Sequence, residues 1–292
     1  MNKSKIEWCD YTWNPLTGCY HDCKYCYAKK IANRFGNHDV TDLGNEMTIQ
    51  LNTKPSNPYP YKFIPTFHKY RLEEPAQKTK GKKIFVCSMA DLFGDWVPNE
   101  WIEEVFNACF EAGQHQYMFL TKNPKKINES IEYFENEERG FGLNEGYWNN
   151  FWFGTSVTCQ DDIERIKYLE FSEGHKFLSI EPLLSDIKLD LSGYCCPKCG
   201  SINVYNDNPK TTPKGIPAYY CDDCGEWEGD KPKGITDWAI IGAQSGPGAV
   251  KPKPEWIRSI VEQCNAAGVP VFMKNSLKPY WEGELIQEWP EG

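Results

Sequence analysis

The regular alternation of short apolar segments with helical segments is the feature that most constrains how this chain can fold. Apolar or β-branched runs that predict strands lie at residues 83–88, 116–121, 151–156, 175–181, 238–242 and 269–274. Amphipathic patterns that predict helices lie at residues 99–112, 124–134, 161–171 and 254–267. Continuous apolar strands that alternate with helices predict a parallel sheet whose faces are covered by the crossover helices.

One more strand is expected before Cys19, which brings the strand count to about seven. The sequence therefore predicts an α/β fold, as a partial or complete (β/α) barrel, with a doubly wound open sheet as the alternative. In both folds the polar residues that close the strands face one crevice. These residues are Ser88, Asp91, Thr121, Lys122, Thr155, Ser156, Glu181, Gln244, Ser245 and Lys274.

Composition excludes several classes of protein. With 292 residues, 40% hydrophobic and 14% aromatic, the chain has room for one large core or two small ones, and it is neither disordered nor a charged coiled coil. A net charge of -9 argues against a nucleic-acid binder that uses its whole surface, although a local basic groove stays open. No run approaches the roughly 18 apolar residues of a membrane span, and the start has no secretion-signal pattern, so we expect a cytoplasmic protein without membrane contact.

Two segments interrupt the alternation. Residues 36–82 are rich in Pro, Asn and Tyr and predict an irregular excursion packed on the domain. Within it, His68, Lys69 and Arg71 could recognise a phosphate, the alternative being a packed loop with solvated cations. Residues 193–234 carry their own cysteines. The predicted domains are therefore a barrel of residues 1–192 and 235–292 and an inserted subdomain of residues 193–234.

Cys19, Cys23 and Cys26 form a Cys-x3-Cys-x2-Cys motif between the first expected strand and a helix at residues 27–35. Three thiolates suit a soft metal or an iron–sulfur cluster, and three instead of four leave one iron of a 4Fe-4S cube without a protein ligand. The alternatives are a zinc knuckle that uses His21 as its fourth ligand, or three unrelated buried thiols.

Cys196, Cys199, Cys221 and Cys224 form two Cys-x2-Cys pairs with the spacing of a zinc ribbon, and a glycine follows each pair. Four thiolates complete a tetrahedron, so this site is predicted to be structural, with rubredoxin-like iron or an auxiliary iron–sulfur cluster as the competing occupant. Nearby Lys and Tyr residues could contact nucleic acid. Asp and Glu residues offset that charge, and a ribbon that serves only as a lid is the alternative.

Seven segments of the chain resemble the phage-associated three-cysteine-motif proteins, the Gp37/Gp68 group, which lie near the radical S-adenosylmethionine (SAM) enzymes. The segments are residues 6–19, 65–75, 83–94, 119–124, 177–184, 238–249 and 269–274, and the resemblance as a whole spans residues 5–192 and 235–276. It implies a radical SAM barrel in the host cytoplasm, with a 4Fe-4S cluster on Cys19, Cys23 and Cys26. Tyr25 matches the aromatic residue that precedes the third cysteine in that superfamily.

The resemblance implies that the open iron binds SAM and that its reductive cleavage gives methionine and a 5'-deoxyadenosyl radical. SAM needs acceptors, donors and an apolar slot at the strand ends. We assign Ser88 and Asp91 to its methionyl end, and Thr155, Ser156 and Glu181 to its ribose or ammonium. The turn from Gly242 through Ser245 to Gly248 is assigned to adenine. The alternatives are helix caps, a surface ion pair and a simple turn.

The candidates for substrate binding are Lys122, Lys274, His68 and Arg71. For the two lysines the alternative is that they are solvated at the rim of the crevice. The function predicted from the sequence is that of a radical SAM enzyme, with a nucleic-acid base or nucleotide as the candidate substrate and a flavodoxin- or ferredoxin-like electron donor. The alternative is a nucleic-acid- or protein-binding module whose metal sites are structural. An electron-transfer protein is disfavoured because so much chain surrounds one crevice.

Overall fold

The computed structural model describes residues 1–36, 47–135, 147–169, 174–189, 191, 204–211, 217–221, 225–228 and 235–290. The chain divides into two compact units. The first contains residues 1–156 and 172–175, and the second contains residues 157–171 and 176–292.

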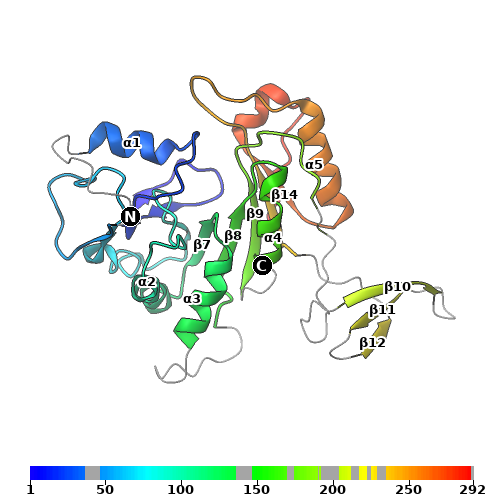
Figure 1. The fold of residues 1–292 in the computed structure, drawn as a ribbon, viewed down its shortest axis with the longest axis horizontal. Helices are drawn as coiled ribbons and strands as arrows, with labels where there is room; N and C mark the ends of the chain where they lie inside the picture. Colours follow the sequence, from blue (N-terminus) through cyan, green and yellow to red (C-terminus); the bar gives the residue numbers. More distant parts are fainter. Residues whose placement is uncertain are drawn as a thin grey trace. The chain divides into compact units, whose positions relative to one another are not determined.

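The first unit is built on parallel strands. Strands β2 (Tyr11–Trp13), β6 (Lys83–Val86), β7 (Gln116–Thr121) and β8 (Phe151–Ser156) pair in parallel in that order, and β1 (Asn2–Lys3) pairs antiparallel with β2. Helices α1 (Tyr27–Phe35), α2 (Asn99–Glu111) and α3 (Lys125–Glu135) lie around these strands (Figure 1). Because the strands are parallel, their carboxyl ends share one edge of the sheet.

An aromatic core holds α2 against the strands of this unit. The Phe106 ring lies edge-on to the rings of Phe119 and Phe151, with centroids 5.8 and 5.9 Å apart. All six residues of β8 are buried. Burying an aromatic side chain of this size contributes roughly 2–3 kcal/mol. The continuous apolar sequence of β8 therefore fixes it as an interior strand.

The excursion packs on the first unit as the sequence predicts, but it carries more regular structure than expected. Strand β5 (Thr66–His68) pairs antiparallel with β3 (Leu16–Thr17) and parallel with β4 (Ile49–Leu51), and the short helix η1 (Lys69–Arg71) follows. All three residues of β5 are buried. The excursion therefore lies against the segment that leads into the first cysteine motif.

The second unit also has a parallel sheet. Its strands β9 (His175–Ile180), β13 (Trp238–Ile241) and β14 (Val271–Met273) pair in that order. Its helical elements are η3 (Gln160–Asp162), α4 (Glu164–Leu169), α5 (Pro254–Ala266) and η4 (Asn275–Tyr280). A separate antiparallel sheet contains β10 (Val204–Thr211), β11 (Pro217–Cys221) and β12 (Gly225–Glu228).

The structure confirms a mixed α/β fold with parallel pairing, and it contains a strand at each position expected from residue 83 onward and helices near residues 99–112, 124–134 and 254–267. The single helix expected at residues 161–171 is instead η3 followed by α4, and residues 170 and 171 lie outside the described residues. Strand β6 ends at Val86 because Cys87 has a φ of 58°, which takes the backbone out of the extended region. Closure into a barrel stays a prediction. Among the helices of the described residues, none combines the length and apolarity that crossing a membrane requires.

Candidate cluster-binding site

The first cysteine motif lies between β3 and α1, where Gly18 sets the path of the chain. Gly18 has a φ of 87°, and a Cβ atom added to it would come within 2.4 Å of the Ile64 carbonyl oxygen. Its amide donates to the Met89 carbonyl at 2.9 Å, and the Cys19 amide donates to the Phe63 carbonyl at 3.1 Å. A glycine at position 18 therefore lets the chain reach Cys19 while bonded to both the excursion and the segment after β6.

Two of the three sulfur atoms accept backbone hydrogen bonds. Cys26 caps the N-terminus of α1, and its Sγ accepts the Lys29 amide at 3.3 Å. The Sγ of Cys19 accepts the His21 amide at 3.5 Å. Backbone N–H donors and a helix N-terminus both stabilise negative charge on sulfur.

The three thiols lie close enough to interact electrostatically. Burial, together with the charges of Asp91, Cys23 and Cys26, raises the pKa of the Cys19 thiol to about 12, while the hydrogen bond from the His21 amide acts to lower it. A bound cation reverses this effect and favours the thiolate. The site is therefore electrostatically suited to a positively charged metal centre.

Three cysteine thiols are a donor set that an iron–sulfur cluster can use. In the described part of the chain, no three His, Cys, Asp or Glu side chains gather as one metal ion would require. A 4Fe-4S cluster instead takes each cysteine on a different iron, so its ligands need not converge on one point. His21 Nε2 lies 2.8 Å from Asp91 Oδ2, and metal-ligating histidines also pair one ring nitrogen with a carboxylate, so the zinc knuckle stays an alternative.

Asp91 joins the cysteine motif to the sheet. Its Oδ2 accepts from His21 Nε2 at 2.8 Å and from the Lys122 amide at 2.9 Å, and its Oδ1 accepts from the Phe93 amide at 3.1 Å. Burial raises the pKa of Asp91, but the hydrogen bond and charge of His21, with the Lys122 amide and Thr121, hold that pKa below its ordinary value. Asp91, which the sequence analysis assigned to SAM, is therefore a charged carboxylate that hydrogen-bonds to other residues of the protein.

An aromatic side chain packs on the cysteine motif. The Trp96 ring lies 5.4 Å from the Tyr20 ring and 4.9 Å from the His21 ring, centroid to centroid, in edge-on arrangements. Gly94 makes room for it, because a Cβ there would lie 2.3 Å from the indole. Within the described residues, the buried Trp96 Nε1 has no hydrogen-bond acceptor. Trp96 therefore packs against the segment between Cys19 and Cys23.

The other candidates of the first unit lie at the carboxyl ends of its strands, and several are engaged. Ser88 Oγ donates to Asn14 Oδ1 at 3.2 Å, and Thr155 Oγ1 donates to the Thr121 carbonyl at 3.0 Å. Ser156 is buried at the end of β8. Lys122 Nζ lies 5.7 Å from the centre of the Tyr25 ring, which connects β7 to the cysteine motif.

Asn14 is a residue that our sequence analysis missed. Its Oδ1 accepts from Ser88 and from the Met89 amide at 2.9 Å, and its carbonyl accepts from Arg71 Nη1 at 2.8 Å. Asn14 is the first residue after β2. The rule that identified polar residues at strand ends would have found it, had the bounds of that first strand been specified.

His68 and Arg71 are placed differently from the expected phosphate site. His68 is buried, with Nε2 2.8 Å from Thr17 Oγ1 and Nδ1 3.2 Å from the Tyr70 hydroxyl. Burial, with a smaller effect of the Arg71 guanidinium, lowers the pKa of His68 to about 3. The His68 imidazole is therefore neutral and hydrogen-bonds within the protein. The Arg71 side chain donates a hydrogen bond to the Asn14 carbonyl.

In the second unit, Glu181 and Lys274 form an ion pair at the carboxyl ends of β9 and β14, with Lys274 Nζ 2.5 Å from Glu181 Oε1. A Cβ on Gly242 would come within 2.9 Å of the Glu181 carboxyl group. The absence of a side chain at Gly242 therefore lets the Glu181 carboxyl group lie against the backbone there. Ser245 is exposed in the turn that follows β13.

The second cysteine cluster lies almost wholly outside the described residues. Cys195, Cys196, Cys199 and Cys224 lie outside the described residues, and Cys221 ends β11 without a described side chain, so the zinc ribbon stays a prediction.

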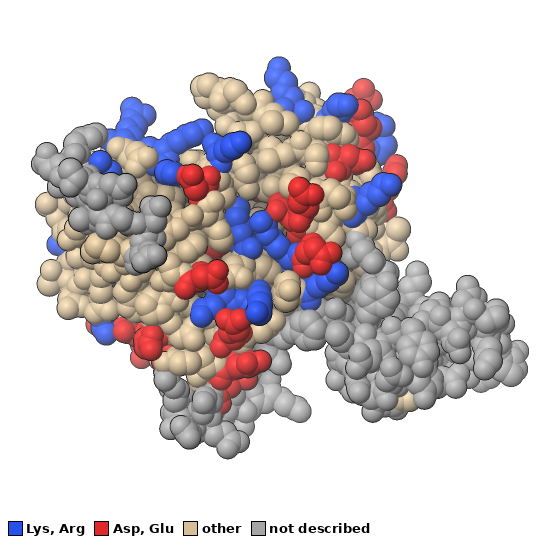
Figure 2. Space-filling view, in the orientation of Figure 1, with Lys and Arg blue, Asp and Glu red and all other residues tan. Residues whose placement is uncertain are grey.

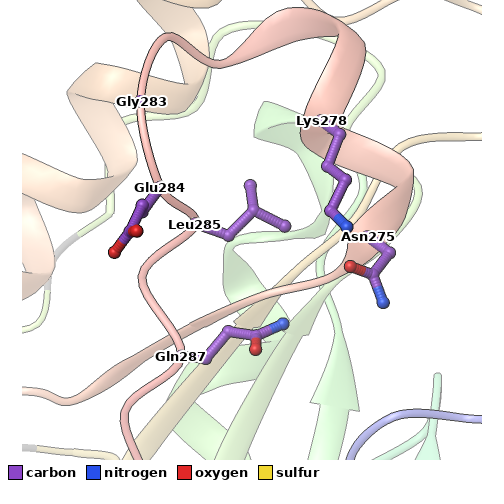
Figure 3. Close-up of a pocket in the computed structure, with 6 residues that line it drawn as sticks. All are labelled: Asn275, Lys278, Gly283, Glu284, Leu285 and Gln287. Carbon is purple, nitrogen blue, oxygen red and sulfur yellow. The ribbon is translucent and has the colours of Figure 1, made fainter.

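A pocket of about 480 Å³ in the second unit is lined by Asn275, Lys278, Gly283, Glu284, Leu285 and Gln287 (Figure 3). Sequence reasoning gave no signal for it, because its walls are η4 and an irregular segment.

Comparison with known proteins gives a family. One solved structure, a mutant of spore photoproduct lyase, matches with a TM-score of 0.39 and 12% sequence identity over 62% of this chain and 48% of that chain. The chain thus spans about half the length of that protein. No curated protein matches the sequence. Residues 3–282 match the family described as "Protein of unknown function (DUF5131)". The chain therefore belongs to the DUF5131 family.

Proposed function

We propose that the protein is a radical SAM enzyme whose 4Fe-4S cluster is held by Cys19, Cys23 and Cys26. One observation carries the proposal. The three cysteines occupy the segment between β3 and α1, next to the carboxyl end of β6, and both Cys19 and Cys26 receive backbone N–H bonds on sulfur. Three soft ligands without a fourth leave one iron open to a cosubstrate.

When bound, the cluster would supply the electron that breaks a carbon–sulfur bond of SAM and yields the 5'-deoxyadenosyl radical. The protein's own residues hold the ligands and shape the surroundings. Asp91 fixes His21, and with it the segment between the first two cysteines, against the end of β7. Trp96 covers the same segment with an apolar ring. These contacts position the segment that carries the thiols.

The strand ends of the first unit are the proposed SAM contacts. Ser88, Thr155 and Ser156 follow or end β6 and β8, at the edge where parallel sheets bind ligands. Glu181, Gly242 and Ser245 of the second unit stay candidates for the ammonium, ribose or adenine. A nucleic-acid base or nucleotide stays the candidate substrate, by analogy and not from site chemistry.

Anaerobic reconstitution with iron and sulfide, followed by dithionite and SAM, tests the proposal. We expect protein-bound iron and sulfide, a broad visible absorbance, and release of 5'-deoxyadenosine measured by mass spectrometry. Cys23→Ala should lose the absorbance and the product. Cys159→Ala, a partly exposed cysteine outside the motif, is the matched control and should keep both. A fully loaded protein that releases no 5'-deoxyadenosine would favour the binding module with structural metal sites.

A further inference from the structure

An exposed apolar stripe runs along α1 directly after the third cysteine. Tyr27, Ile31 and Phe35 are 53%, 37% and 55% exposed. Their spacing of four residues places them on one side of the helix, whereas Ala28 and Ala32 are buried. Large apolar side chains gathered in this way on a soluble protein mark an interaction site.

Basic residues border this stripe. Lys30 and Arg34 are exposed and one helical turn apart, and Lys24 is exposed just before the helix. The Arg34 guanidinium lies 5.3 Å from the centre of the Phe35 ring, beside the stripe. Lys and Arg side chains are visible over the region of α1 (Figures 1 and 2).

The local charge is opposite to that of the whole protein. Between residues 19 and 36, Asp22 is the only acidic residue in the sequence, and it pairs with Lys29 at 2.5 Å. The chain as a whole has a net charge of -9. An acidic partner would therefore be attracted to α1 and repelled by much of the remaining surface.

The stripe is also close to the proposed cluster. Tyr27 follows Cys26 directly, and its hydroxyl donates to the Ser88 carbonyl at 2.6 Å, which fixes the first residue of the stripe against the segment after β6. Each step of four residues advances about 6 Å along the helix. A partner seated on Tyr27 and Ile31 would thus lie within a turn or two of the thiols.

We propose that the α1 surface, defined as Lys24, Tyr27, Lys30, Ile31, Arg34 and Phe35, docks a small acidic one-electron carrier protein. The proposal rests on the proposed function, which creates the need for an electron. One electron leaves the carrier, which is oxidised, and enters the iron–sulfur cluster, which is reduced, with no bond or proton change in that transfer. The apolar stripe supplies contact area and the basic border supplies orientation.

Nucleic acid fits this surface less well than an acidic protein does. Nucleic-acid affinity comes mainly from repeated phosphate contacts along a basic track. The α1 surface instead has three apolar side chains at its centre and cations only at its border. An aliphatic residue at the centre, Ile31, suits a protein interface better than a phosphate backbone.

Charge reversal on α1 tests the proposal. The variants are Lys30→Glu with Arg34→Glu, and Ile31→Ser. The matched control is Lys125→Glu with Lys167→Glu, which reverses two exposed helix lysines elsewhere. Three quantities are measured on reconstituted protein: binding of flavodoxin by calorimetry, the rate at which reduced flavodoxin bleaches the cluster absorbance, and SAM cleavage driven by dithionite.

We expect the charge-reversed variant to bind flavodoxin more weakly and to be reduced by it about tenfold more slowly, because electrostatic steering is lost. Ile31→Ser should weaken binding with a smaller change in its salt dependence. The control variant should behave as the wild type, and dithionite-driven cleavage should be equal in all four proteins, because dithionite needs no docking surface.

The outcomes separate the two proposals. Equal flavodoxin binding and equal bleaching rates for wild-type and charge-reversed protein would overturn the docking surface, whatever the activity. Flavodoxin binding that depends on α1, combined with no dithionite-driven cleavage, would leave the docking surface standing and reject radical SAM chemistry. Binding of a single-stranded oligonucleotide that is lost in the charge-reversed variant, without flavodoxin binding, would replace the carrier by nucleic acid.

Discussion

Asp91 accepts a hydrogen bond from the imidazole of His21 at 2.8 Å, although the two residues are 70 positions apart in the chain. The same carboxylate oxygen accepts the Lys122 amide, so one buried atom connects the cysteine motif, the segment after β6 and the end of β7. The loop that carries the three thiols is therefore fixed to the end of the parallel sheet by hydrogen bonds to Asp91.

Asp91→Ala should destabilise the protein and impair cluster loading. The substitution removes Oδ1, which accepts the Phe93 amide, and Oδ2, which accepts the Lys122 amide, at a cost of about 3 kcal/mol. Chemical unfolding would measure the stability, and bound iron per chain would measure the loading. Asp91→Asn keeps an acceptor and should lie between the alanine variant and the wild type. Unchanged stability of the alanine variant would contradict this role.

Gly242→Ala should lower the melting temperature. The added methyl group meets the Glu181 carboxyl group at 2.9 Å, so either Glu181 leaves Lys274 or the end of β13 shifts, at a cost of about 1–3 kcal/mol. Gly113→Ala is the matched control, because its nearest neighbour, the Phe110 carbonyl, lies at an ordinary 3.4 Å. Equal melting temperatures for the two variants would show that Glu181 does not occupy this space tightly.

His68 should make stability depend on pH. Burial and the Arg71 guanidinium lower its folded-state pKa from 6.5 to about 3, so the unfolded chain takes up a proton at a higher pH than the folded chain. Its stabilising effect is complete above the unfolded pKa and decreases by about 1.4 kcal/mol per pH unit as pH falls from 6.5 toward 3.

Urea unfolding of wild-type protein and His68→Gln across this pH range measures the effect. Glutamine carries no titrating proton, so the difference in unfolding free energy between the two proteins should shrink as the pH falls. A difference that is constant with pH would mean that His68 is not held neutral in the folded protein.

Removal of the proposed cluster should loosen the cysteine motif without unfolding the first unit. The ligands that a cluster joins are brought together only in the folded chain, so metal binding stabilises the segment that carries them. Hydrogen exchange of residues 19–35 should be faster after anaerobic treatment with an iron chelator than in the loaded protein. Exchange in α2, which packs in the aromatic core, serves as the internal control, and faster exchange in both segments would contradict a local effect.

Much of the architecture followed from the sequence because its signals are local. The apolar run of β8 and the amphipathic period of α5 specify their own secondary structure, and alternation of such elements specifies parallel pairing. The Cys-x3-Cys-x2-Cys spacing likewise identified the thiols, because all three lie within one short segment. None of these features depends on which distant residues meet.

Tertiary structure alone decided how the site is supported. Asp91 was recognised as a polar residue after a strand, but its partner His21 could not be deduced, since long-range pairing leaves no local pattern. The sequence left His68 open as part of a phosphate site or of a packed loop, and burial of β5 against β3 decided that its imidazole is neutral. The sequence determined which chemical groups the protein has and which segments carry them, whereas burial and long-range hydrogen bonds decided which of those groups stay charged and which serve only to hold the others.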